Sequence, residues 1–526
     1  MRSVLPLLFV SLALSTTGVE RVHAEAKMAI NLAGPADWNT ELPWVDVFRM
    51  ARPWISQREG AGWGQGPELS LDENGYPTRL PEGVFAESML CTIEGGRYPQ
   101  GGYTVLYDGT GRIEFARASV VDRSPGRMVV KPHGSKGFSL QLHETDPDDR
   151  VRNIRVIMPG FEDTYAENPW HPVFLGRWRG MASIRFMDFM HTNDSEVSSW
   201  AQRPEPDDMT FSKKGVPVEL MVDLANRVDA DPWFCMPHAA DDGYVRRFAE
   251  YVAENLDPDL DVYVEYSNEV WNGQFDQNEY AAKRGQELGL AEKPWQAAWL
   301  YTARRSVEVF GLWEQAFGGA DRLVRVIPSQ AANPYVAKQI LGHADAADHA
   351  DALAIAPYMG IVPKGEQEAR EVAALGVEGV LDRLETEVLP EVIATRFRGN
   401  KAVADSYGLE LIAYEAGQHL VGTRGAENHQ PLTDVFHAAN RHPRMGELYT
   451  KYFEAWDSVG GGAMAHFSSI SSWSKWGSWG LMQYYDQDPA NSPKFQAVID
   501  AAQSWGQSLE AVSLEGGAAP PAAEPR

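Results

Sequence analysis

Residues 261–275 read DVYVEYSNEVWNGQF and contain the transition that decides the fold. Residues 261–267 are rich in valine and tyrosine that alternate with other residues, a pattern typical of a β-strand. The chain becomes polar at residues 267–269 (SNE), and a long amphipathic stretch follows at residues 295–317. A short buried strand followed by a helix is the repeating unit of parallel α/β folds.

The same unit recurs on both sides of this stretch. Further strands are predicted at residues 28–34, 182–188, 232–237, 323–329, 352–357, 409–414 and 463–468. Helices are predicted at residues 216–228, 243–255, 295–317, 378–395, 445–459 and 493–505. Eight strands separated mostly by helices favour a closed barrel over an open sheet, and no strand is followed by a phosphate-binding GxGxxG turn. We therefore predict an α/β fold of the (β/α)₈ TIM-barrel type.

A second unit interrupts this pattern early in the chain. From about Gly66 to Phe161 short alternating runs such as YTVLYDG and GFSLQLHE lie between turn residues, and no helical pattern separates them. We interpret this segment as a small antiparallel β-domain inserted into the barrel. The predicted organisation is a signal peptide at 1–24, the barrel at 25–66 and 162–506, the inserted domain at 67–161 and a disordered tail at 507–526.

The first residues predict export. Arg2 precedes an apolar run at residues 4–14 (VLPLLFVSLAL), and residues 22–24 (VHA) offer the small residues of a signal-peptidase site. We expect the mature protein to begin at Glu25 and to be periplasmic or secreted, with an uncleaved anchor as the alternative. No later stretch has the length of a membrane-spanning helix, so we expect no membrane insertion of the mature chain.

Charge and cysteine content narrow the function classes. The formal net charge is −26, which repels nucleic acid, and no basic stripe compensates for it. Only two cysteines occur, and Cys235 lies in the apolar run WFCM, where a buried free thiol is expected. We expect no disulfide between Cys91 and Cys235, and neither a cofactor nor a resident metal.

Two strands end in a carboxylate. Glu269 follows the fourth predicted strand, and Glu415 ends the seventh, LELIAYE at residues 409–415. Barrel enzymes keep their active sites at this C-terminal rim. Two carboxylates that face each other at about 5 Å are what a double-displacement glycosidase requires. The alternative is that both are ordinary rim glutamates, solvated or salt-bridged.

The motifs around these glutamates carry a family resemblance. YSNEVWN at residues 266–272 and YEAGQ at residues 414–418 resemble glycoside hydrolase clan A, the barrel superfamily that includes cellulases, mannanases and β-galactosidases. The resemblance covers the barrel alone. It implies a retaining hydrolase of β-linked polysaccharides or oligosaccharides, with Glu269 as acid/base and Glu415 as nucleophile. Asn268 would then hold the sugar 2-hydroxyl.

The resemblance also implies roles for residues near other strand ends. Arg185 would lie beside the nucleophile, and Tyr358 would hydrogen-bond to it. His238 would donate to sugar hydroxyls, and one of the tryptophans in SSWSKWGSWG, with Trp473 nearest the strand, would form the floor under the sugar. Further cleft residues are expected at Asp37, Trp38, Trp271 and Asn272.

Two other functions compete with this interpretation. A metal-dependent barrel hydrolase needs an HxH pair after the first strand, which MAINLAG lacks, and His238, Asp241 and Asp242 have no ligand spacing with a partner. A non-catalytic glycan-binding protein on a decayed barrel is the second alternative, and the presence of both carboxylates argues against it. The inserted domain could be a binding module or a wall that lengthens the cleft.

Overall fold

The computed structural model describes residues 27–514, and within them eight parallel strands close into a barrel. In order around the barrel they are β1 (Met28–Asn31), β10 (Ser183–Arg185), β11 (Asp231–Met236), β12 (Val262–Tyr266), β13 (Leu323–Pro328), β14 (Ala352–Ile355), β16 (Glu410–Ala416) and β18 (Met464–His466). Each predicted strand overlaps one of these, so the predicted (β/α)₈ barrel is confirmed. Beyond the sixth and seventh barrel strands, β15 (Met359–Ile361) and β17 (Gln418–Leu420) form a separate parallel pair.

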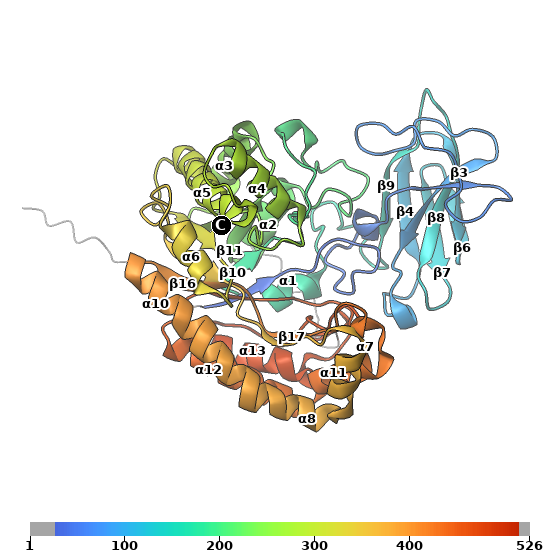
Figure 1. Ribbon diagram of the computed structural model, residues 1–526. Helices are drawn as coiled ribbons and strands as arrows, with labels where there is room; N and C mark the ends of the chain where they lie inside the picture. The colour runs from blue at the N-terminus through green and yellow to red at the C-terminus, as the bar shows by residue number, and fades with distance from the viewer. Residues whose placement is uncertain (1–26, 515–526) are drawn as a thin grey trace, which may run out of the picture.

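Helices follow the strands and cover the barrel (Figure 1). They are α1 (Pro172–Trp178), α2 (Val218–Val228), α3 (Asp242–Asn255), α4 (Asp276–Glu287), α5 (Pro294–Phe317), α6 (Pro334–Leu341), α7 (Gly365–Ala374), α8 (Gly376–Arg383), α9 (Leu389–Glu391), α10 (Arg398–Tyr407), α11 (Gln430–Arg441), α12 (Pro443–Ser458) and α13 (Pro493–Ser504). Local signals set some ends: the Asp241 side chain accepts from the Tyr244 N–H and caps α3, and left-handed Asp229 terminates α2.

The barrel interior and the layer under the helices are separate cores. Along β11, Trp233 and Cys235 point into the barrel, whereas Phe234 and Met236 pack against the helices. The interior core also contains Ala29, Val326, Ala352, Ala354, Ile412, Tyr414 and Ala465. Because so many of these side chains are alanine, the interior has room for the large indole of Trp233 and for polar side chains from other strands.

The inserted domain lies between β1 and β10 as two antiparallel sheets, drawn blue to cyan beside the barrel in Figure 1. One sheet has the order β2 (Ile55–Arg58), β3 (Val84–Leu90), β8 (Phe138–Thr145) and β5 (Gly111–Ala116); the other has β6 (Ala118–Ser124), β7 (Arg127–Pro132), β4 (Tyr103–Asp108) and β9 (Arg152–Ile157). The predicted antiparallel insertion is confirmed. Its start at residue 67 is too late, because β2 pairs with β3 and so belongs to the insertion.

Polar contacts fix the inserted domain beside the barrel mouth. Asp37, in the loop after β1, accepts two hydrogen bonds from Arg52, at 2.9 and 2.8 Å, and one from the Thr92 hydroxyl. Arg97 forms an ion pair of 2.8 Å with Asp486, in the segment after β18. The insertion is thus attached to loops at the C-terminal ends of the first and eighth barrel strands. Asp37, expected in the cleft, instead joins the two domains.

The C-terminal segment packs against the barrel. The predicted signal peptide at 1–24 lies outside the described residues. The prediction of a disordered tail does not hold for its first residues, because the buried Gln507 side chain donates to the Met28 and Gly180 carbonyls and Leu509 is buried. Cys235 is a buried free thiol, as expected, and Cys91 is buried and free as well. Among the described residues, no helix combines the length and apolar character needed to cross a membrane.

Candidate active site

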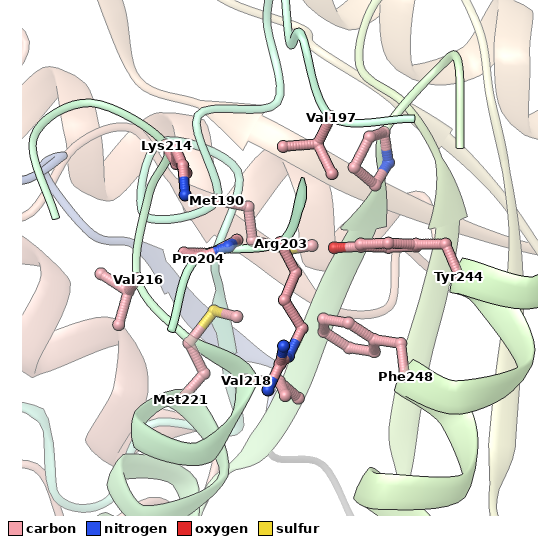
Figure 2. Close-up of a pocket in the computed structure, with 11 residues that line it drawn as sticks. Met190, Val197, Arg203, Pro204, Lys214, Val216, Val218, Met221, Tyr244 and Phe248 are labelled. Atoms are coloured by element: carbon pink, nitrogen blue, oxygen red, sulfur yellow. The ribbon is translucent and has the colours of Figure 1, made fainter. Parts of the chain in front are cut away.

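A cavity of about 740 Å³ opens at the C-terminal ends of the barrel strands and contains both Glu269 and Glu415. A cavity of about 300 Å³ lies where the insertion meets the barrel, and its Asp72 and Asp208 are ion-paired with Arg150 and Lys214. Figure 2 shows a third cavity, ringed by mostly apolar side chains around Arg203. Its volume of about 10 Å³ is room for a single water. The large cavity is therefore the candidate site.

Glu269 enters the cavity from a backbone conformation that is rare for its residue type. It follows β12, and both Ser267 and Glu269 have positive φ, 60° and 44°. Non-glycine residues in this region are uncommon and concentrate at functional sites. The carboxylate accepts hydrogen bonds from Asn272 Nδ2 (2.9 Å) and from the Tyr414 hydroxyl (3.2 Å). Two neutral donors thus hold Glu269.

Glu415 is directed into the cavity by an irregularity in β16. Between Ala413 and Ala416, β16 has one residue more than the facing stretch of β18, which is the signature of a bulge. A bulge re-aims side chains, so Tyr414 and Glu415 both reach the site although they are chain neighbours. Glu415 is 6% exposed. Its carboxylate accepts from Arg185 Nη1 (3.3 Å) and from the Tyr358 hydroxyl (2.8 Å).

Arg185 connects the two glutamate-bearing strands from inside the barrel. It is fully buried and donates to both carboxylate oxygens of Glu265, at 3.0 and 3.2 Å. It also donates to Asn31 Oδ1 (3.1 Å) and to Asn268 Oδ1 (2.9 Å). A buried guanidinium held this firmly orients Asn268 and places a positive charge beside Glu415.

The two cavity glutamates differ in their electrostatic surroundings. Burial raises the pKa of Glu415, and the charge of Glu269 raises it further, whereas Arg185 and the Tyr358 hydrogen bond lower it. Burial also raises the pKa of Glu269, whereas the hydrogen bonds from Asn272 and Tyr414 and the charge of Arg185 lower it. Two neighbouring, largely buried carboxylates resist ionising together, so this arrangement favours a pair that holds one proton.

Several predicted site residues meet in the cavity. Asn268, Tyr358, Trp271 and Asn272 line it with the two glutamates. Arg185 lies directly behind Glu415. These residues come from four different barrel strands or the segments that follow them, which is how a barrel assembles a site at its rim.

Three predicted substrate contacts lie outside the cavity lining. Trp473 does not line the cavity, since its indole donates to the Gly480 carbonyl (3.1 Å) and packs against the Arg441 guanidinium and the Lys494 amine. The two later tryptophans of the same loop, Trp476 and Trp479, line the cavity instead.

Trp38 and His238 do not line the cavity either. Trp38 is 56% exposed and stacks under Arg52 at 5.6 Å, in the contact that joins the barrel to the insertion. The His238 ring is buried and packs edge-on against Tyr280 at 5.2 Å. His238 is thus part of the packing against α4, which carries Tyr280.

The sequence contained signals for residues that were missed. Phe467 directly follows β18, so the strand-end rule that found Glu269 also applies to it, and it lines the cavity. Glu265 lies at an inward position of β12, two residues after Tyr263, and alternation along the strand identifies it. No comparable signal marks His419, which lines the cavity beyond β16.

Within residues 27–514 no group of three or more His, Cys, Asp or Glu side chains is placed to hold a metal ion. No protein-family model matches the chain, and no curated protein sequence matches it.

The chain is similar to solved structures of glycoside hydrolases. One is a 4-O-α-L-rhamnosyl-β-D-glucuronidase from Fusarium oxysporum, with 12% identity, a TM-score of 0.37, and coverage of 65% of this chain and 66% of that chain, just under two thirds. A glycoside hydrolase family 5 mannosidase from Rhizomucor miehei has 12% identity and a TM-score of 0.33, and the match covers 64% of this chain and 86% of the mannosidase chain. An endo-β-1,4-mannanase from Cellulomonas fimi has 11% identity and a TM-score of 0.34, and the match covers 64% of this chain and 67% of the mannanase chain.

Proposed function

We propose that this protein is a retaining glycoside hydrolase that cleaves a β-linked polysaccharide or oligosaccharide. One observation carries the proposal: two carboxylates from the fourth and seventh barrel strands, Glu269 and Glu415, share one cavity and have different hydrogen-bond donors. A paired acid and nucleophile need unequal surroundings, because one carboxyl must hold a proton while the other is ionised.

The donor sets assign the roles. The Arg185 charge favours the ionised form of both glutamates, but Arg185 donates a direct hydrogen bond, of 3.3 Å, to Glu415 and none to Glu269, so we assign the ionised form to Glu415. Glu269 accepts only from neutral donors, and we place the shared proton there. Glu415 is therefore the nucleophile and Glu269 the acid/base, in agreement with the family resemblance.

The reaction follows from these roles in two steps. Glu415 attacks the anomeric carbon and forms a glycosyl ester, while the glycosidic oxygen leaves with the proton of Glu269. The ionised Glu269 then takes a proton from water, the water oxygen bonds to the anomeric carbon, and the ester bond to Glu415 breaks. Both glutamates return to their starting states, and the product keeps the configuration of the substrate.

Neighbouring side chains would bind and orient the sugar. Asn268 Oδ1 accepts from Arg185, and one Nδ2 hydrogen goes to Asn193 Oδ1 (3.0 Å), which leaves the other Nδ2 hydrogen for the 2-hydroxyl. Trp479 and Phe467 line the cavity, and their rings pack edge-to-face with centroids 5.9 Å apart. Together they present an apolar surface that suits the CH face of a sugar. Trp479 replaces Trp473 as the proposed floor.

The proposed place of action is outside the cytoplasm. It rests on the signal-like residues 1–24, and secretion of a tagged chain truncated to begin at Glu25, compared with that of the full chain, tests it. Loss of export on truncation is expected. Equal export of both forms contradicts the proposal.

A panel of β-linked glycans tests the activity. We expect release of reducing ends by the wild type and no turnover by Glu415→Gln, which keeps the side-chain shape. Glu410→Gln is the matched control, since Glu410 lies on the same strand at the opposite end. Glu415→Gln activity within about tenfold of wild type, about 1.4 kcal/mol in the barrier, removes Glu415 from the nucleophile role. Tight glycan binding without cleavage by the wild type would favour the non-catalytic alternative.

A further inference from the structure

One wall of the cavity is built from hydrogen-bond donors. Its donors are His419 on β17, Arg424 in the loop after β17, and Arg396 from the helical stretch between α9 and α10, and Glu427 lies beside them in the cavity lining. The mechanism proposed above uses none of these side chains. Their chemistry therefore bears on which substrate the cavity accepts.

His419 is fixed as a donor. The Trp479 indole N–H donates to its Nδ1 (3.2 Å), so this nitrogen carries no hydrogen. Burial lowers the pKa of His419 to about 4, and the Arg396 charge acts in the same direction. The ring is therefore neutral at ordinary pH and carries its hydrogen on Nε2. It lies between the Tyr358 and Trp479 rings, at 5.1 and 5.6 Å, and lines the cavity.

The two arginines add positive charge to this wall. In the part of the chain that the structure describes, Arg424 forms no ion pair or hydrogen bond, although acidic residues outnumber basic ones by 73 to 47. Its φ of 55° is unusual for a non-glycine residue. Arg396 Nη1 donates to the Tyr358 carbonyl (2.7 Å), and its Nε lies 3.4 Å from Glu391.

One carboxylate shares the wall, and its oxygens are already engaged. Glu427 accepts from the Gly425 N–H (2.8 Å) and from Asn428 Nδ2 (3.2 Å). Both partners belong to the same loop, and among the described residues no ion pair joins Glu427 to Arg424. The positive charge of Arg424 is thus left for a ligand.

We propose that this wall binds an anionic group of the substrate, a uronate carboxylate or a sulfate ester, so that the preferred substrate is an acidic β-glycan. Guanidinium groups bind such oxyanions more strongly than they bind sugar hydroxyls, because the hydrogen bonds are charge-assisted. A neutral glycan would leave Arg424 solvated and unused. The inference rests on the proposed function for the identity of the cavity as a glycan site.

Paired ligands test this inference independently of cleavage. The ligands are β-linked uronic acid oligosaccharides with their carboxyl-reduced counterparts, and sulfated oligosaccharides with their desulfated counterparts. Calorimetry with Glu269→Gln measures binding without rapid turnover. We expect one acidic series to bind roughly ten- to hundredfold more tightly than its neutral counterpart, with the advantage shrinking at high salt. The series that shows it identifies carboxylate or sulfate as the group.

Variants at the wall locate the effect. Arg424→Gln should remove most of the preference, Arg424→Lys should keep most of it, and Arg398→Gln, at an exposed arginine on α10, should leave it unchanged. Equal binding within each pair, including no measurable binding of either member, overturns the inference. So does an undiminished preference in Arg424→Gln. Preferential binding of the acidic member without cleavage by the wild type supports the inference and contradicts the proposed function.

Discussion

The Tyr414 hydroxyl donates a hydrogen bond to Oε1 of Glu269, 3.2 Å away, although Tyr414 is the chain neighbour of Glu415. The β16 bulge makes this possible, because it directs two consecutive side chains toward the cavity. Strand β16 thereby supplies the Glu415 carboxylate and, through Tyr414, a neutral hydrogen-bond donor to the Glu269 carboxylate. The positions of the two glutamates are thus coupled through a single short segment of backbone.

Azide rescue distinguishes the roles of the two glutamates. Glu269→Ala should lose most activity on a natural glycan and keep far more on an aryl glycoside whose leaving group departs unaided. The glycosyl-enzyme should then accumulate, because no base remains to activate water. Azide needs no base, so it should restore turnover and give a glycosyl azide of retained configuration, measured by proton NMR.

Glu415→Ala is the matched comparison for this experiment. Azide should enter directly at the anomeric carbon and give the inverted product. Rescue of Glu269→Ala with inversion would mean that the two roles are exchanged. Failure of both variants to respond on every accepted substrate would remove the support for a paired-carboxylate mechanism.

Tyr358→Phe should change the pH dependence of activity. The Tyr358 hydroxyl lies 2.8 Å from Glu415 and lowers its pKa, so its loss should raise the pKa of the nucleophile. Because the nucleophile must be ionised, the acidic limb of the kcat/KM profile should move to higher pH. Tyr335→Phe, at an exposed tyrosine, is the control. An acidic limb that stays in place or moves to lower pH contradicts the role given to Tyr358.

Arg185→Met should destabilise the fold as well as abolish activity. Arg185 and Glu265 form a fully buried ion pair of 2.9 Å, and removal of one partner leaves an uncompensated buried charge. The expected loss is about 3–5 kcal/mol of unfolding free energy, measured by urea denaturation. Arg398→Met, at an exposed position, should change it by less than about 0.5 kcal/mol. An unchanged urea midpoint for Arg185→Met would show that this ion pair is dispensable.

The two loop tryptophans should separate binding from stability. Trp479→Ala removes an aromatic surface from the cavity, so KM should rise several-fold to roughly tenfold. Trp473→Ala should leave KM unchanged and lower the urea midpoint, since Trp473 packs against Arg441 and Lys494. A KM effect confined to Trp473→Ala would restore it as the sugar-binding tryptophan.

The sequence predicted the features that depend on short-range pattern. Barrel strands buried on both faces produce apolar runs that end at the rim, so Glu269 and Glu415 could be found from strand ends alone. The inserted domain was recognised in the same way, from alternating runs between turn residues. Its start was placed too late because Ile55–Arg58 is a four-residue strand whose pairing with Val84–Leu90 spans a long loop.

Features that depend on packing could not be predicted. The path of the loop decides that Trp476 and Trp479 line the cavity and Trp473 does not, and Lys494 holds this path through the carbonyls of Ser478 (2.8 Å) and Trp479 (3.3 Å). The bulge that directs Glu415 inward leaves no mark in LELIAYE. The direction of the Arg185 side chain likewise required the barrel to be closed.

The stereochemistry of cleavage tests the central claim most directly. Double displacement through Glu415 predicts that the first-formed product, followed by proton NMR before mutarotation, has the anomeric configuration of the β-linked substrate. Two carboxylates spaced for an intervening water would give the opposite anomer. Appearance of the β-anomer first is the predicted result, and appearance of the α-anomer first would contradict the account.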